Sequence, residues 1–168
     1  NAIPEIIITH TVKKKNQVLT VGEVNEETYL RKGLDRFIKI AKKMPTIQFI
    51  HIGNWTDNHG RVNSKMIEYV KSISPSNMHY LGYVENKELE KYYEESKIYL
   101  QLSRHEAFGV SVVEAMSKGC FPIVSRAFAL PEIIGDYGVC VDWDITQIIC
   151  EIKNGLKNNN IESLINQS

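Results

Sequence analysis

The sequence predicts an α/β fold, in which a Rossmann-like parallel sheet is sandwiched by helices. Apolar runs of strand length alternate with amphipathic helical patterns along the whole chain. The apolar runs are continuous rather than alternating, so both faces of the sheet are expected to be covered. No repeat or linker-like stretch interrupts the pattern. The 168 residues therefore suit one domain with its own core.

The first part of the chain begins with a strand and continues as a strand–helix–strand unit. Residues 1–16 are expected to form an outer strand or linker that ends in a turn. The first sheet strand, 17–24, is rich in β-branched residues, and helix 31–44 stops just before Pro45. The apolar face of this helix carries Leu34, Phe37, Ile38, Ala41 and Met44. The second strand is 46–53.

The middle of the chain repeats this alternation twice. A second amphipathic helix is expected from Val62, Met66, Ile67, Val70 and Ile73. Strand 77–84 follows, and then a helix that Asn86 is expected to cap. The buried side of that helix carries Leu89, Tyr92 and Tyr93. Strand 97–103 comes next.

The last part contains two helices and two short strands. Helix 109–118 is expected to end at Gly119, a favoured residue after a helix C-terminus. Strands 120–125 and 138–143 follow, and residues 158–168 form a polar C-terminal tail. The final helix takes its apolar face from Ile145, Ile148, Ile149, Ile152 and Leu156.

Composition narrows the class of protein. Hydrophobic residues make up 43% and charged residues 24%, and the formal net charge is zero. A zero net charge argues against a nucleic-acid partner, and no apolar run reaches the roughly 18 residues of a spanning helix. The three cysteines, Cys120, Cys140 and Cys150, have no metal-like spacing and are expected as buried thiols of a cytoplasmic protein. The chain begins at Asn1 rather than Met, and we expect a piece of a longer protein.

The basic run 13–15 has two readings. A solvated turn is the simpler, and a peripheral contact with a membrane surface is the alternative. His51, Asp57 and His59 share one segment, but they lack tight ligand spacing, so no metal is expected there.

Ligands of a parallel sheet bind beyond the carboxyl ends of its strands. The segments to inspect are therefore 22–33, 53–61, 82–86, 103–110 and 125–132. The glycine fingerprint of dinucleotide oxidoreductases and the P-loop are both absent after the first strand, which excludes these two classes.

Two segments carry candidate ligand-binding residues. Lys32 lies at the start of a helix, where it suits a phosphate. In 103–116, Gly109 opens a helix whose free amides favour a diphosphate. Glu106 lies at the strand end, and Glu114 lies among apolar residues, where vicinal sugar hydroxyls are a good partner.

The segment 81–143 resembles the C-terminal, donor-binding half of a retaining glycosyltransferase of family 4 (group 1), which has the GT-B fold. The similarity covers roughly 17–155. The residues that carry it are Leu81, Gly82, Val84, Ser103, Glu106, Phe108, Gly109, Glu114, Ala115, Met116, Gly119, Pro131, Glu132 and Ile133, together with the Lys32-Gly33 pair.

The resemblance implies a role for each matching residue. Glu114 would bind the ribose of a nucleotide sugar, and Glu106 would contact the donor sugar. Lys32 would neutralise charge on the leaving diphosphate. The implied contacts to the diphosphate are amides near Phe108, Gly109 and Val110, and those to the base are Tyr83 and Val84.

One residue departs from the family pattern. The family usually has an arginine directly after the first-strand glycine, as a second phosphate contact, and Glu23 stands there. Arg31, beside Lys32, is the candidate to compensate, although the loop between them is longer than usual.

The implied function is transfer of a hexose from a UDP- or GDP-sugar to a glycan, lipid-linked or small acceptor, with retention and without a cofactor or metal. The acceptor-binding N-terminal domain lies outside this sequence, so residues 1–168 are expected to form a single nucleotide-sugar-binding domain that is inactive alone. The alternatives are a non-catalytic binding module of the same fold, a nucleotide-sugar epimerase, or a phosphorylase.

Overall fold

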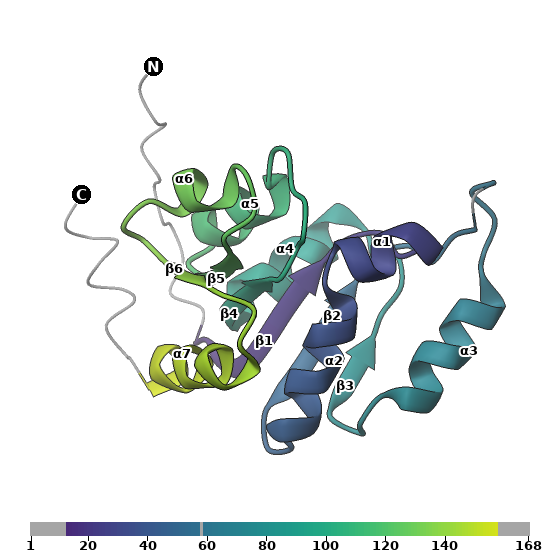
Figure 1. Cartoon of the computed structure of the whole chain (residues 1–168), viewed down its shortest axis with the longest axis horizontal. Helices are drawn as coiled ribbons and strands as arrows, with labels where there is room; N and C mark the ends of the chain where they lie inside the picture. Colours follow the sequence, from purple (N-terminus) through teal and green to yellow (C-terminus); the bar gives the residue numbers. More distant parts are fainter. Residues whose placement is uncertain (1–12, 58, 158–168) are drawn as a thin grey trace.

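In the computed structural model, which describes residues 13–57 and 59–157, six parallel strands form one sheet (Figure 1). The strand order is β3-β2-β1-β4-β5-β6. The strands are β1 (Lys15–Val21), β2 (Gln48–Ile52), β3 (Met78–Tyr80), β4 (Ser96–Gln101), β5 (Phe121–Ser125) and β6 (Val139–Val141). The predicted fold class is confirmed.

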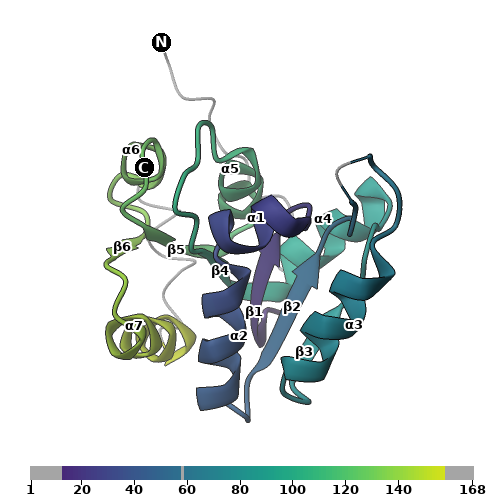
Figure 2. The same cartoon turned by 45° about the vertical axis from the view of Figure 1, so that its right-hand side comes forward.

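Seven helices cover this sheet within the described residues (Figure 2). They are α1 (Glu26–Arg31), α2 (Leu34–Lys43), α3 (Ser64–Ile73), α4 (Asn86–Glu95), α5 (Val110–Ser117), α6 (Leu130–Ile134) and α7 (Ile145–Lys157). Buried residues of α2, α3 and α7 share one apolar core, and those of α4, α5 and α6 share another. The sheet therefore has a helical layer on each face.

Neighbouring residues of a strand supply the two cores. Val18 belongs to the α2–α3–α7 core, and Leu19 belongs to the α4–α5–α6 core. In β4, Ile98 and Tyr99 divide in the same way, and all four side chains are fully buried. Successive side chains of a strand point to opposite faces, which explains why the apolar runs in the sequence are continuous.

The strand order reverses beside β1. The chain adds β2 and β3 on one side of β1, and then returns to add β4, β5 and β6 on the other. The carboxyl ends of β1 and β4 therefore flank a topological switch point, where open α/β sheets place their ligands.

Several boundaries differ from the sequence prediction. β1 begins at Lys15, so the turn expected before residue 17 is shorter. The segment predicted as a long loop contains α1, and α6 is a helix that the sequence did not predict. Val62, expected in the second amphipathic helix, lies before α3 and is exposed. Asn86 is the first residue of α4 rather than its cap, because Glu85 occupies the cap position. The outer strand expected near the N-terminus and the tail at 158–168 concern residues outside those described, apart from 13–16.

The cysteines are less uniform than expected. Cys120 is buried, Cys140 is half-buried and Cys150 is exposed. The prediction of a buried thiol is therefore wrong for Cys150, which lies on the outward face of α7. All three thiols are free.

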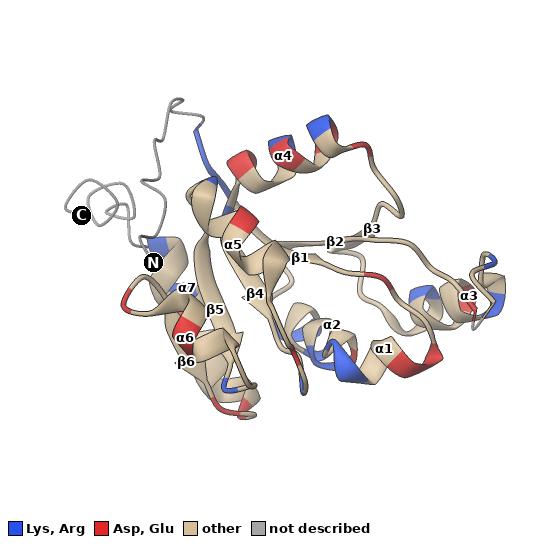
Figure 3. Cartoon of the chain, turned by 90° about the horizontal axis from the view of Figure 1, so that it is seen from above, with Lys and Arg blue, Asp and Glu red and all other residues tan. Residues whose placement is uncertain are grey.

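Charges of both signs are spread over the helices (Figure 3). In the basic run, the Lys14 Nζ donates to the carbonyls of Tyr93, Ser96 and Lys118. Lys15 pairs with Glu95. Two of the three lysines thus have partners in the fold. No helix among the described residues is long and apolar enough to cross a bilayer.

Candidate functional site

The carboxyl end of β4 lies against the junction of α1 and α2. Lys32 and Gly33 lie between these helices, and Lys32 is the C-cap of α1 rather than the start of a helix, which is where the sequence predicted it. Gly33 has a φ of +75°. A Cβ atom at this position would lie 2.1 Å from the Leu102 carbonyl oxygen. Only glycine allows so close an approach, and this packing brings Lys32 next to the loop that follows β4.

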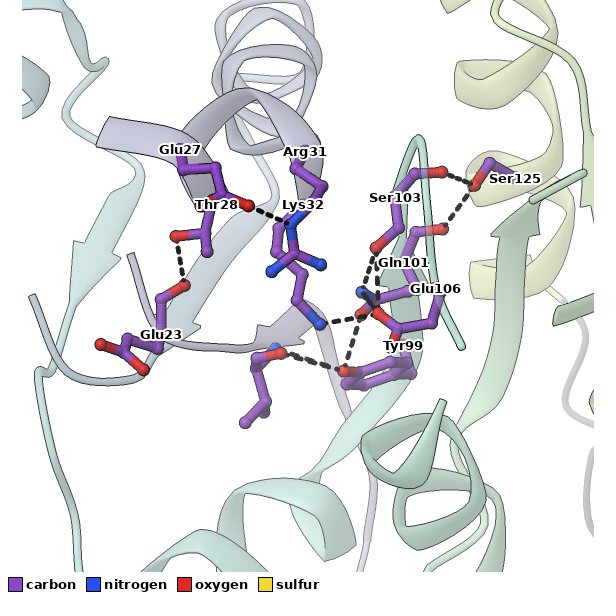
Figure 4. A network of polar contacts seen from close by, with 11 residues as sticks. Glu23, Glu27, Thr28, Arg31, Lys32, Tyr99, Gln101, Ser103, Glu106 and Ser125 are labelled. Atoms are coloured by element: carbon purple, nitrogen blue, oxygen red, sulfur yellow. Dashed lines mark hydrogen bonds and ion pairs between the residues drawn. The ribbon is translucent and has the colours of Figure 1, made fainter. Parts of the chain in front are cut away.

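An ion pair joins the two segments across the switch point (Figure 4). The Lys32 Nζ lies 2.7 Å from the Glu106 Oε2, and both side chains are largely buried, with exposures of 25% and 13%. The two residues are 74 positions apart. The fold therefore brings together the two candidate catalytic residues that the sequence identified.

Glu106 also accepts hydrogen bonds from its own side of the site. The Ser103 Oγ and the Gln101 Nε2 lie 3.3 Å and 3.4 Å from the Glu106 Oε2. Burial raises the pKa of Glu106. Lys32, the Gly109 backbone amide and Ser103 together lower this pKa by more than burial raises it, so it lies below its usual value. Glu106 is therefore a carboxylate at neutral pH.

A buried chain of side chains fixes the Glu106 partners. The Tyr99 hydroxyl donates to the Gln101 Oε1 at 3.0 Å, and the Gln101 Nε2 donates to the Ser103 Oγ at 2.6 Å. Ser125 donates to the Ser103 carbonyl. Tyr99 and Gln101 are not among the site residues predicted from the sequence. Their polar atoms in an otherwise apolar buried strand were the available signal.

Arg104 ties the β4–α5 loop to the α1–α2 junction. Its amide donates to the Arg31 carbonyl at 2.7 Å, and its guanidinium donates to the Leu30 carbonyl. The same guanidinium makes two bonds of 3.2 Å to the Asp35 carboxylate. Arg104 therefore holds residues on both sides of Lys32, through the Leu30 and Arg31 carbonyls before it and the Asp35 carboxylate after it. The sequence did not reveal this role.

The N-terminus of α5 opens toward the same edge of the sheet. Gly109 precedes this helix with a φ of +54°, and no side chain caps it. A Cβ at Gly109 would lie 2.9 Å from Ile133 and 3.0 Å from Leu130, so glycine lets α5 and α6 pack closely. The Phe108 and Val110 side chains are exposed. The Val112 and Val113 amides donate to the Gly109 carbonyl. The amides before them lie at a helix N-terminus, a suitable setting for an anion.

Glu114 lies farther along α5 and is exposed to solvent. The Tyr93 hydroxyl, on α4, donates to the Glu114 Oε2 at 3.0 Å. Glu106 and Glu114 thus occupy different settings. The first is paired with a cation in a partly buried network, and the second presents an exposed carboxylate that one buried hydroxyl anchors.

Glu23, which replaces the expected arginine, does not face Lys32. Its carboxylate accepts a hydrogen bond from the Thr56 hydroxyl, and Figure 4 shows it directed away from the Lys32–Glu106 pair. The Arg31 Nε lies 3.6 Å from Glu27. In the same view the Arg31 side chain runs in the same direction as that of Lys32.

The two residues assigned to the base lie in the β3–α4 loop. Tyr83 is exposed, and Val84 packs against the α4–α5–α6 core. The Gly82 carbonyl accepts from the Gly53 amide at 2.8 Å, so this loop is joined to the one after β2. Within the described residues, the hydrogen bonds and ion pairs of Lys32 and Glu106 involve neither Tyr83 nor Val84.

The segment after β2 holds a buried histidine. His51 packs against Trp55 and Tyr80, and its Nδ1 is buried without a partner. Burial lowers the pKa of His51 to about 4, against a smaller opposing effect of a hydrogen bond with the Gly22 backbone. Within the described residues, no three His, Cys, Asp or Glu side chains gather in a way that could hold a metal.

The arrangement combines groups that suit a nucleotide diphosphate. A cation and a helix N-terminus favour negative charge. Two carboxylates, Glu106 and Glu114, are acceptors for sugar hydroxyls. Glu106 lies at the switch point and Glu114 lies on α5. An extended ligand that has hydroxyls at both ends and phosphates between them would match these groups.

The family model described as "Glycosyl transferases group 1" matches residues 4–166. An uncharacterised 41.2 kDa protein in the cps region of Klebsiella pneumoniae is 30% identical over 142 residues, which cover 83% of this chain and 36% of that protein. The chain therefore spans about a third of the length of this relative.

Two solved structures share the fold. A sucrose-phosphate synthase from Thermosynechococcus elongatus has a TM-score of 0.74 at 21% identity, over 90% of this chain and 38% of that one. The C-terminal domain of a Francisella tularensis group 1 glycosyl transferase family protein has a TM-score of 0.67 at 21% identity. That comparison covers 93% of this chain and 83% of the domain. The fold is thus that of a C-terminal GT-B half.

Proposed function

The chain belongs to the group 1 glycosyl transferases, and we propose that it is the nucleotide-sugar-binding half of a retaining hexosyltransferase. The donor is a UDP- or GDP-linked hexose, and no metal or cofactor takes part. The observation that carries this proposal is the Lys32–Glu106 ion pair at the switch point, beside the open N-terminus of α5.

The diphosphate is assigned to the space between Lys32 and α5. The Lys32 ammonium and the amides around Phe108, Gly109 and Val110 stabilise charge that grows on the diphosphate as it leaves. Arg31 is a second cation next to Lys32 in the chain. It is assigned the part of the missing arginine, because Glu23 is turned toward Thr56.

The two ends of the donor are assigned to the two carboxylates. Glu106 accepts from hydroxyls of the hexose and orients the ring, and Lys32 keeps it ionised. Glu114 accepts from the ribose hydroxyls, because its carboxylate is exposed and anchored at one oxygen. Tyr83 and Val84 flank the base.

In the reaction, the bond between C1 of the hexose and the diphosphate oxygen breaks, and the diphosphate leaves with the electron pair. An acceptor hydroxyl forms the new bond to C1 on the same face and gives its proton to the departing diphosphate. The acceptor is a glycan, a lipid-linked sugar or a small molecule, and a second domain, outside this chain, binds it.

Calorimetric titration with UDP and with GDP tests the donor site. We expect one nucleotide to bind and Glu114→Ala to weaken that binding by about 1–3 kcal/mol, since a charged acceptor is removed. Glu68→Ala, an exposed carboxylate on α3, is the matched control and should bind as the unchanged chain does. Binding of neither nucleotide, by this chain or by a longer protein that contains it, would favour the non-catalytic module instead.

A further inference from the structure

Tyr93 lies beneath the carboxylate that is assigned to the ribose. We propose that Tyr93 is a positioning residue for ribose recognition, acting through its hydrogen bond to Glu114. This inference rests on the proposed function, because it assumes that Glu114 contacts the nucleotide. It adds a residue on α4, which has no other part in the proposed site.

Contacts of the fold hold both the side chain and the backbone carbonyl of Tyr93. Its side chain is 2% exposed, and its ring lies 6.0 Å from that of Tyr99 at the centroids. Its carbonyl accepts from the Cys120 Sγ at 3.0 Å and from the Lys14 Nζ at 3.1 Å. A side chain packed in this way has one position for its hydroxyl.

Among the described residues, the Tyr93 hydroxyl has one hydrogen-bond partner, the Glu114 Oε2, at 3.0 Å. Burial raises the pKa of Tyr93, with Tyr99 and Glu114 adding to the effect, so the hydroxyl stays protonated and donates. An exposed glutamate otherwise samples several rotamers, and ordering it on ligand binding costs free energy. The bond to Tyr93 meets part of that cost before the ligand arrives.

The geometry also leaves room for a ligand. Tyr93 uses one lone pair of Oε2, and an ionised carboxylate has about four acceptor sites. Within the described residues, Tyr93 is the only side chain that donates to the Glu114 carboxylate. Glu114 is also exposed, so its remaining acceptor sites are accessible to a ligand, and a vicinal diol supplies two donors for them.

The neighbouring tyrosine gives a matched control. Tyr92 is half-buried on the same helix and lines a different hollow, with Lys15, His79 and Glu88. Within the described residues, the Tyr92 hydroxyl makes no hydrogen bond, and the Tyr92 carbonyl accepts from the Ser96 hydroxyl. Tyr92→Phe thus removes a hydroxyl from the same helix without affecting Glu114.

The test measures binding of UDP and GDP, and of their 2′,3′-dideoxy forms, to the unchanged chain, Tyr93→Phe and Tyr92→Phe. We expect Tyr93→Phe to weaken binding of the ribonucleotide about tenfold, or about 1.4 kcal/mol. The dideoxy form, which has no ribose hydroxyls at these positions, should bind equally to the unchanged chain and to Tyr93→Phe. Tyr92→Phe should change neither affinity. Thermal unfolding of each variant reports any general loss of structure.

A double-mutant cycle completes the test. In a Glu114→Ala background, where the Tyr93 hydroxyl has lost its acceptor, Tyr93→Phe should weaken ribonucleotide binding by less than twofold, because the two residues act as one unit. Equal losses for the ribonucleotide and its dideoxy form would overturn the inference and make Tyr93 merely structural. Full ribonucleotide affinity in Tyr93→Phe would overturn it as well. Failure of both the unchanged chain and the longer protein that contains it to bind any nucleotide would instead refute the proposed function, and the inference with it.

Discussion

At the scale of single residues, the Lys32–Glu106 pair determines the charge of the site. Replacing Lys32 by Met removes the cation but leaves Glu106 partly buried, so burial would then raise the pKa of Glu106 above its usual value. We expect NMR titration of the glutamate carboxyls to show this upward shift in the variant and a lowered value in the unchanged chain.

The same variant should lose affinity for the nucleotide diphosphate. A charge-assisted bond is removed, so the expected loss is about tenfold or more. Lys65→Met, which removes an exposed lysine of α3, is the control and should change neither quantity. A Glu106 pKa that stays low in Lys32→Met would mean that backbone and hydroxyl donors suffice, and that Lys32 does not set the charge of Glu106.

His51 makes stability depend on pH. Its pKa is lowered to about 4 in the folded chain and returns to the ordinary 6.5 on unfolding. The stabilising effect is therefore complete above pH 6.5 and is lost as the pH falls toward 4, at about 1.4 kcal/mol per pH unit. Between pH 7 and pH 5 the loss is about 2 kcal/mol.

Urea unfolding at these two pH values measures the effect of His51. The His51→Phe variant should lose about 2 kcal/mol less than the unchanged chain over this range. His79→Asn removes an exposed histidine and should keep the full dependence. The same slope in the unchanged chain and in His51→Phe would show that other groups, such as the paired carboxylates, account for it.

At the scale of elements, two glycines separate the effects of backbone conformation and packing. Gly33 and Gly60 have nearly equal φ angles, +75° and +74°. A Cβ at Gly33 would meet the Leu102 carbonyl, whereas a Cβ at Gly60 would meet nothing within 4 Å. Gly60→Ala should therefore cost about 1 kcal/mol for its left-handed backbone alone.

Gly33→Ala should cost clearly more than Gly60→Ala, by about 2 kcal/mol, because α2 must move away from β4. Denaturant unfolding of both variants measures the difference. Equal costs would mean that the α1–α2 junction moves without penalty, and that the close contact does not fix the position of Lys32.

Arg104 links the two segments that carry Lys32 and Glu106. In Arg104→Met, the Asp35 carboxylate loses its guanidinium donor and the Leu30 carbonyl keeps only its backbone donors, so the junction is less firmly held. We expect nucleotide affinity to fall about fivefold, a loss typical of one hydrogen bond. Arg126→Met removes an exposed pair with Asp142 and should have little effect. Unchanged affinity in Arg104→Met would exclude a bracing role.

Elements with a long periodic pattern could be predicted from the sequence, and short ones could not. Helix α2 shows an apolar residue every third or fourth position, whereas α1 and α6 have six and five residues. The signal for α1 was a capping box of Asn25 and Thr28. In the site, motif spacing identified Glu106 and Lys32, but their pairing depends on how Gly33 packs on β4, which no local pattern encodes.

At the scale of the whole molecule, the site lies on an edge that remains open. Phe108 and Phe128 are 78% and 68% exposed on loops that follow β4 and β5, and Val110 is 63% exposed at the start of α5. Phe128 also has a φ of +48°, unusual for a residue with a side chain. Large apolar side chains gathered at one edge typically mark a surface that another part covers.

This open edge underlies the last prediction, that the chain binds the donor nucleotide but transfers no sugar alone. Lys32, Glu106, Glu114 and the start of α5 all lie within this chain, so nucleotide binding needs no other part. Transfer also needs a bound acceptor and exclusion of water from C1. Mass spectrometry should therefore detect no glycosylated acceptor with the chain alone, but should detect it with the longer protein, under conditions in which calorimetry shows the nucleotide bound to both.

Transfer by the isolated chain would place the acceptor site within these 168 residues. Nucleotide binding by the longer protein alone would instead mean that the second half completes the donor site.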